Sequence, residues 1–96
     1  MDIDVHDIPD SARYEARLDG ALLGYAAYAL TDGVVVFKHT VVEPNHEGRG
    51  VGSALVQAAL DDVRQRQLKA VPRCSFVRDW LDRHPTYADL VLDANP

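Results

Sequence analysis

A glycine-rich segment in the middle of the chain constrains the fold most. Residues 47–53, EGRGVGS, join a β-branched run, 34–42, to an amphipathic run, 54–67. The change of period predicts a strand, a tight turn and a helix. Backbone N–H groups at a helix start lack partners, and the helix dipole favours negative charge there. The turn is therefore suited to a phosphate-bearing ligand of the nucleotide type.

Two hairpin signals precede this segment. Asp19-Gly20 and Asp32-Gly33 separate three strand candidates, 13–18, 21–30 and 34–42. Because residues 21–30 are almost wholly apolar, we expect this strand to be central in the sheet and covered on both faces. The pattern predicts an antiparallel three-strand meander.

The first residues give a weaker signal. Residues 1–11 show little periodicity, and Pro9 and Asp10 interrupt any regular element. We expect an extended or partly ordered lead-in here, followed by one domain over residues 12–96. A chain of 96 residues is long enough to bury one core, and a second domain is not expected.

The second half alternates helix and strand. After the long helix, residues 69–72 form a short strand candidate that would return beside the third strand through a crossover. Ser75 is a candidate cap for a second helix, and His84-Pro85 ends it, because a residue before proline is pushed out of the helical region. The sequence thus predicts an α/β (α+β) domain: a three-strand meander, a helix, a fourth strand and a second helix.

Composition narrows the function. The net charge of −5 disfavours non-specific binding to nucleic acid, and no apolar stretch is long enough for a membrane-spanning helix. The acidic N-terminus lacks the layout of a secretory signal, and one cysteine, Cys74, cannot form an internal disulfide. We expect a cytoplasmic protein. His, Cys and Asp show no metal-site spacing, so no metal is assigned.

Several segments together resemble a known family. They are residues 38–42 (KHTVV), 47–52 (EGRGVG), 71–77 (VPRCSFV) and 80–87 (WLDRHPTY). In order and spacing they resemble the acetyl-coenzyme A binding core of the GNAT superfamily of N-acetyltransferases, and more closely its short, cysteine-containing branch. The resemblance covers most of the chain from about residue 24 to residue 91. It implies a single-domain GNAT-like fold that uses acetyl-coenzyme A as co-substrate.

The resemblance also implies a cofactor site. The superfamily's loop pattern, Arg/Gln-x-x-Gly-x-Gly/Ala, places its glycines on Gly50 and Gly52 but its first position on Glu47, whose carboxylate would repel a pyrophosphate unless it points away. Main-chain donors need no particular side chain, and Arg49 offers a compensating charge. The end of the third strand would pair with the pantetheine arm. The residues assigned to cofactor binding are Val41, Val42, Gly48, Arg49, Gly50, Val51, Gly52 and Ser53.

Two residues are candidates for catalysis. His39, on the strand that would face the thioester, is suited to accept a proton from an ammonium group; the alternative is a histidine held in the sheet by a structural hydrogen bond. Cys74, between a strand and a helix, is suited to form a thiolate. It either takes the acetyl group as a thioester intermediate or lines the pocket while the amine attacks directly. The alternative for Cys74 is an inert buried side chain.

Three further residues are weaker candidates for a functional role. Tyr87 loosely matches the tyrosine that often protonates the departing thiolate in the superfamily, but packing of the C-terminal tail explains it as well. His84 is explained by the helix end, and Trp80 by the core.

The function predicted is an N-acetyltransferase that acts on an unidentified amine, as a monomer or small homo-oligomer. The acidic balance favours a cationic acceptor. The rivals are a module that binds acyl-coenzyme A or a protein partner without turnover and, ranked last, a structural or interaction domain with no cofactor.

Overall fold

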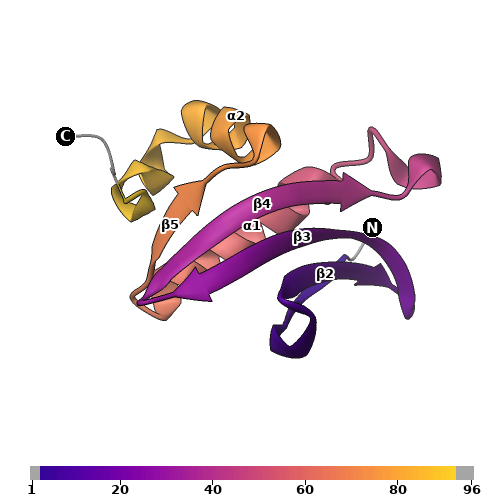
Figure 1. Cartoon of the computed structure of the whole chain (residues 1–96). Helices are drawn as coiled ribbons and strands as arrows, with labels where there is room; N and C mark the ends of the chain where they lie inside the picture. Colours follow the sequence, from indigo (N-terminus) through magenta and orange to yellow (C-terminus); the bar gives the residue numbers. More distant parts are fainter. Residues whose placement is uncertain (1–2, 93–96) are drawn as a thin grey trace.

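A computed structural model describes residues 3–92; residues 1–2 and 93–96, at the ends of the predicted lead-in and domain, lie outside the described residues. The order of strands in the single sheet is β1-β2-β3-β4-β5. The first four strands are antiparallel, and β5 is parallel to β4. This α/β arrangement confirms the predicted fold class, with a helix, a strand and a second helix after the antiparallel strands (Figure 1). The elements are β1 (Asp4–Ile8), β2 (Arg13–Leu18), β3 (Ala21–Thr31), β4 (Val34–Val42), α1 (Val51–Gln65), β5 (Lys69–Pro72) and α2 (Ser75–Arg83), with 3-10 turns at Pro9–Ser11, Pro44–His46 and Pro85–Leu90.

The segment before residue 12 belongs to the sheet. It is extended, as expected, but β1 pairs with β2, with Val5 opposite Ala16 and Asp7 opposite Tyr14. Exposed residues alternate with the partly buried Val5 and Asp7. A carboxylate on the inward face masked this alternation in the sequence. The expected three-strand meander is therefore corrected to four antiparallel strands.

Both predicted hairpins are present. Asp19 and Gly20 have φ of 51° and 83°, and Asp32 and Gly33 have φ of 51° and 78°. Two successive positive φ values are what the tightest hairpin turns require, and Asp-Gly tolerates them. These turns place β3 at the centre of the five strands, as predicted.

The helices cover one face of the sheet. Most of the apolar stripe of α1 is buried in the same core as Phe37 of β4 and Trp80 of α2. On the other face Ala27 and Ala29 of β3 are only half-buried, and Figure 1 shows this face toward the viewer with α1 behind the sheet. The expectation that β3 is covered on both faces is therefore wrong. The buried residues of α1 are Val51, Gly52, Leu55, Val56, Ala59, Leu60 and Val63.

Strands β4 and β5 separate halfway along β4. Their pairing ends at Phe37 and Pro72, where the N–H groups of Arg73 and Cys74 both donate to the Phe37 carbonyl, at 3.0 and 3.1 Å. In the described part of the chain, the second half of β4 therefore has β3 on one side and no strand on the other. Helix α2 begins directly after this point, with Cys74, not Ser75, at the N-cap.

Candidate functional site

A cavity of about 380 Å³ lies where β4 and β5 separate. The second half of β4, the glycine-rich segment, the first turn of α1 and the first turn of α2 form its walls. Segments far apart in the sequence thus meet at one place, and the predicted cofactor loop is one of them. The lining residues are Thr40, Val42, His46, Glu47, Gly48, Gly50, Val51, Gly52, Ser53 and Phe76.

The glycine-rich segment presents free backbone donors. Gly48 and Gly50 have φ of 79° and 81°, a conformation that favours glycine, and Gly50 is the N-cap of α1. The first hydrogen bond of α1 runs from the Ala54 N–H to the Gly50 carbonyl, at 3.0 Å. Within residues 3–92, no protein acceptor is found for the amides from Gly48 to Ser53. The loop therefore offers the unpaired N–H groups that an anion needs.

Gly52 has a packing role as well. A Cβ atom at this position would lie 2.7 Å from Cζ of Phe76, so the missing side chain admits the ring against the first turn of α1. Phe76, in the first turn of α2, is 38% exposed on the rim of the cavity. Its ring therefore shapes the cavity instead of filling the core.

The other side chains of the glycine-rich segment have different environments. The Ser53 hydroxyl accepts a hydrogen bond from Nε1 of Trp80 at 2.9 Å and so links α1 to α2. Val51 is buried, whereas Arg49 is exposed and does not line the cavity. Val51 and Ser53 line the cavity and can offer a ligand there their main-chain N–H groups.

The two valines at the end of β4 face opposite sides. Val42 lies opposite Gly24 and lines the cavity, while Val41 lies opposite Tyr25 on the open face of the sheet and is 37% exposed. Gly24 permits this pairing, since a Cβ there would lie 2.5 Å from the Val41 carbonyl oxygen. The free edge of β4, more than either side chain, is suited to an extended ligand.

Cys74 lies beside the cavity on the helix-covered side of the sheet. Its side chain is 8% exposed, and its sulfur is 3.6 Å from the Thr40 hydroxyl. Burial acts to raise the pKa of the thiol, but the Thr40 hydroxyl and the N–H groups of Val77 and Phe76 outweigh burial and lower the pKa. These N–H groups belong to the first turn of α2 and act on the thiol without a cap hydrogen bond to it. The environment therefore favours a thiolate.

Thr40 is a site residue that the sequence analysis missed. A bulge at Lys38, opposite the Ala27–Tyr28 bond, shifts the alternation of β4. Thr40 consequently shares a face with Phe37 and with Cys74, although simple period-two counting from Phe37 puts His39 there. The bulge itself leaves no clear signal in the sequence.

His39 lies on the opposite face of β4 from Cys74. It is exposed, pairs across the sheet with Ala27, and its ring meets the edge of Tyr25 at a centroid distance of 6.2 Å. The structure thus does not bring the two catalytic candidates together. They flank the free half of β4, one on each side.

The C-terminal candidates belong to the helix packing. The Tyr87 hydroxyl donates to Asp61 of α1 at 2.7 Å, and its ring meets Trp80 edge-on. His84 stacks on Trp80 with ring centroids 3.7 Å apart. Trp80 is 1% exposed, which confirms it as core. Neither Tyr87 nor His84 lines the cavity beside Cys74.

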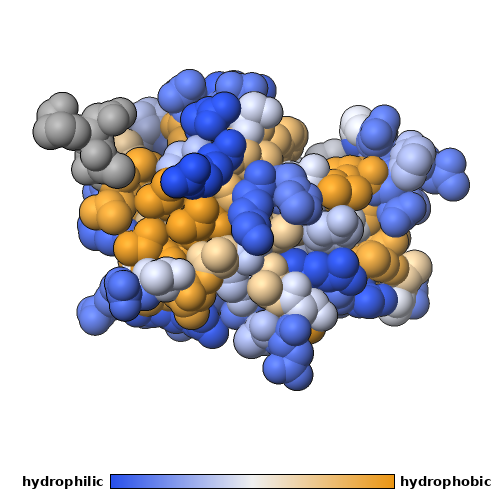
Figure 2. All heavy atoms as spheres, viewed as in Figure 1, coloured by the Kyte–Doolittle hydropathy of each residue, from blue (hydrophilic) through white to orange (hydrophobic). Residues whose placement is uncertain are grey.

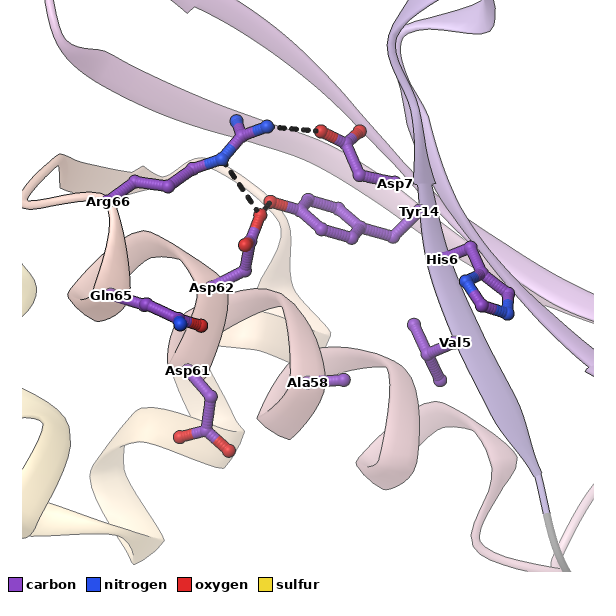
Figure 3. Close-up of a pocket in the computed structure, with 9 residues that line it drawn as sticks. All are labelled: Val5, His6, Asp7, Tyr14, Ala58, Asp61, Asp62, Gln65 and Arg66. Carbon is purple, nitrogen blue, oxygen red and sulfur yellow. Dashed lines mark hydrogen bonds and ion pairs between the residues drawn. The ribbon is translucent and has the colours of Figure 1, made fainter.

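A second cavity, of about 410 Å³, lies between β1 and α1 (Figure 3). Four of its polar residues contact one another: the Tyr14 hydroxyl donates to Asp62 at 2.7 Å, and Arg66 reaches Asp7 at 3.3 Å and Asp62 at 3.5 Å. Burial and the Asp62 bond raise the pKa of Tyr14 far above its usual value. This network ties β1 and β2 to α1, away from the glycine loop and Cys74.

Residues 3–92 contain no group of three His, Cys, Asp or Glu side chains placed to hold a metal ion. No helix among them has both the length and the apolar character needed to cross a bilayer.

Comparison with known proteins finds relatives in sequence and in fold. Protein NATD1 of Gallus gallus and of Mus musculus is 35% identical over 52 residues, which cover 54% of this chain and 47% of each relative; the chain thus spans about half the length of these relatives. A GCN5-like protein from Staphylococcus aureus superposes with a TM-score of 0.71 at 23% identity, covering 96% of this chain and 90% of that one.

A more distant solved structure shares the fold. Ribosomal-protein-alanine N-acetyltransferase from Brucella melitensis biovar Abortus has a TM-score of 0.60 at 24% identity, covering 88% of this chain and 63% of that one. The family model of the GCN5-related N-acetyl-transferases matches residues 13–90, from β2 through the last 3-10 turn. The chain belongs to the family of GCN5-related N-acetyltransferases.

Proposed function

We propose that this chain is an N-acetyltransferase that takes acetyl-coenzyme A in the cavity between β4 and α2 and moves the acetyl group to an amine. One observation carries the proposal: the glycine-rich segment with its free amides and the free half of β4 line one cavity, and the Cys74 thiol lies beside it, 3.6 Å from the hydroxyl of the lining residue Thr40. Acetyl-coenzyme A has a diphosphate, an extended arm and a reactive thioester in the same order. When bound, it supplies an activated acetyl group.

The loop and the strand would hold the ligand. Main-chain N–H groups from Gly48 to Ser53 would donate to the diphosphate, where the α1 dipole adds to the attraction. The free edge of β4, from Lys38 to Val42, would pair with the pantetheine arm as an added strand. Phe76 would cover the arm from the α2 side.

Cys74 has two possible roles in the transfer. In one, its thiolate attacks the thioester carbonyl, the bond from carbonyl carbon to the coenzyme sulfur breaks, and the amine then takes the acetyl group from Cys74. In the other, the amine attacks directly and Cys74 only shapes the pocket. A mass increase of one acetyl group on Cys74 that survives dialysis supports the first route. Its absence during active turnover supports the second.

Calorimetric titration with coenzyme A separates this function from its rivals. We expect binding in the micromolar to millimolar range, and release of free thiol from acetyl-coenzyme A when a suitable amine is added. No heat at millimolar coenzyme A would remove the cofactor altogether. Binding without thiol release, across a broad panel of amines, would instead support a module that holds the ligand without turnover.

A further inference from the structure

The open face of the sheet carries a positively charged notch beside the free half of β4. Arg13, Ala27 and His39 form one row across β2, β3 and β4, since Arg13 lies opposite Ala27 and Ala27 opposite His39. Two strand spacings separate the outer backbones by about 10 Å. The side chain between them, Ala27, is small and half-buried, and this row of three residues is called the notch.

The ring of Tyr25 contacts both outer residues of the notch, Arg13 and His39. The guanidinium of Arg13 lies over the Tyr25 ring, 4.4 Å from its centroid, and the same ring meets His39 edge-on at 6.2 Å. Such contacts reduce the side-chain freedom that a ligand would otherwise have to remove. The charge and the imidazole are therefore already in place.

Glu15 fixes Arg13 without exhausting its donors. Nε and Nη2 of Arg13 both contact Oε2 of Glu15, at 2.8 and 2.7 Å, while Arg17 bonds the other carboxylate oxygen. Within residues 3–92, Nη1 of Arg13 has no acceptor, and the side chain is 29% exposed. One free N–H face of a fixed guanidinium is left toward solvent.

The local charge differs from that of the whole chain. One carboxylate, Glu15, is shared by two guanidinium groups, and the exposed Lys38 lies next to His39 on β4. Asp4, opposite Arg17, is the acidic residue on the neighbouring edge. Around the notch the balance is positive, although the protein carries −5 overall.

We propose that the notch is the acceptor site, and that the acceptor is a small primary amine bearing a carboxylate, which Arg13 binds while the amine lies beside His39. This inference rests on the proposed function and on its direct route: His39 lies on the opposite face of β4 from Cys74, so the amine would attack a thioester held at the split between β4 and β5. It replaces the cationic acceptor that net charge alone favours. Figure 2 shows hydrophilic side chains across the middle of this face, with a large apolar group at the left and smaller ones at the right.

Three amines of equal chain length test the charge preference. With acetyl-coenzyme A as donor, we expect kcat/KM for 5-aminopentanoate to exceed that for pentylamine by about ten-fold, as for a partly exposed charge-assisted hydrogen bond, and 1,5-diaminopentane to be the poorest. Equal rates for the three, or a preference for the diamine, would overturn the inference.

Variants of the two arginines locate the effect. Arg13→Gln should reduce the ratio of 5-aminopentanoate to pentylamine to about one, whereas Arg17→Gln, an equal change of net charge on the same strand, should keep the ratio. Arg13→Lys keeps the positive charge and should retain part of the preference for 5-aminopentanoate. It also serves as the control in case the Arg13→Gln protein misfolds. If the ratio falls equally in the Arg13→Gln and Arg17→Gln proteins, the preference comes from the general positive charge of this face and not from Arg13, which would contradict the proposal.

Binding is measured separately from turnover. In the protein loaded with coenzyme A, 5-aminopentanoate should shift the amide signals of Ala27 and His39, and pentylamine should not. If calorimetry detects no binding of coenzyme A, the proposed function itself is wrong. Normal coenzyme A binding without these amide shifts would remove the acceptor site alone.

Discussion

Cys74 shows how position gives one side chain its chemistry. The N–H groups in the first turn of α2 and the Thr40 hydroxyl lower the pKa of a thiol that burial alone would raise. We expect Cys74→Ala to keep its affinity for coenzyme A, because the diphosphate seat is on the glycine loop, but to lower kcat by on the order of 100-fold. Thiol-release assays at saturating amine measure this. Unchanged turnover would reduce Cys74 to packing.

Glu47 is the loop residue whose charge opposes the ligand. It is exposed on the cavity that would hold the diphosphate. A unit charge at about 8 Å in water contributes about 0.5 kcal/mol, so Glu47→Gln should tighten coenzyme A binding about two-fold and Glu47→Arg further, at low salt. Asp10→Asn, outside the cavity lining, is the control with an equal change of charge. A higher Kd for coenzyme A in the Glu47→Gln protein would mean that the carboxylate helps to build the site.

The contact between α1 and α2 depends on a glycine in a helix. Gly52→Ala places a methyl group against the Phe76 ring, so we expect a loss of about 1 kcal/mol in free energy of unfolding. In a Phe76→Ala background the same change should be neutral or stabilise by up to about 1 kcal/mol, because alanine favours the helix. Chemical denaturation of the four proteins measures the coupling. The same effect in both backgrounds would show that the ring is not the obstacle.

Strand β2 owes part of its stability to a carboxylate on the open face. Hydrogen bonds from Arg13, opposed by burial and aided by Arg17, lower the pKa of Glu15. A carboxyl with a lowered folded-state pKa stabilises above its unfolded value, near 4, and loses that contribution as pH falls through the folded value. Glu15→Gln should therefore cost about 1 kcal/mol at pH 7 and progressively less below pH 4. Denaturation at pH 7 and pH 3 measures both; a constant difference would contradict this role.

Across the whole molecule, the elements that the sequence predicts are those with strong local signals. Two Asp-Gly turns, a β-branched strand and an amphipathic helix each specify their own backbone. β1 was not predicted, because Asp7 occupies an inward position and is compensated by Arg66, far along the chain. Such a partner leaves no local pattern.

The candidate site was predictable in its backbone and much less in its side chains. Glycines that need positive φ identified the loop, and the junction of strand and helix identified Cys74. The bulge at Lys38 decides which β4 residue meets the thiol, and it exchanges Thr40 for His39.

Binding of a diphosphate by the free amides of the glycine loop can be followed by amide NMR during a titration with coenzyme A. We expect the largest shift changes on residues 48–53, with smaller ones along the free half of β4. Amides around the cavity between β1 and α1, such as Ala58 and Gln65, should stay in place. Shift changes concentrated at Ala58 and Gln65, or none at the loop with saturating coenzyme A, would contradict it.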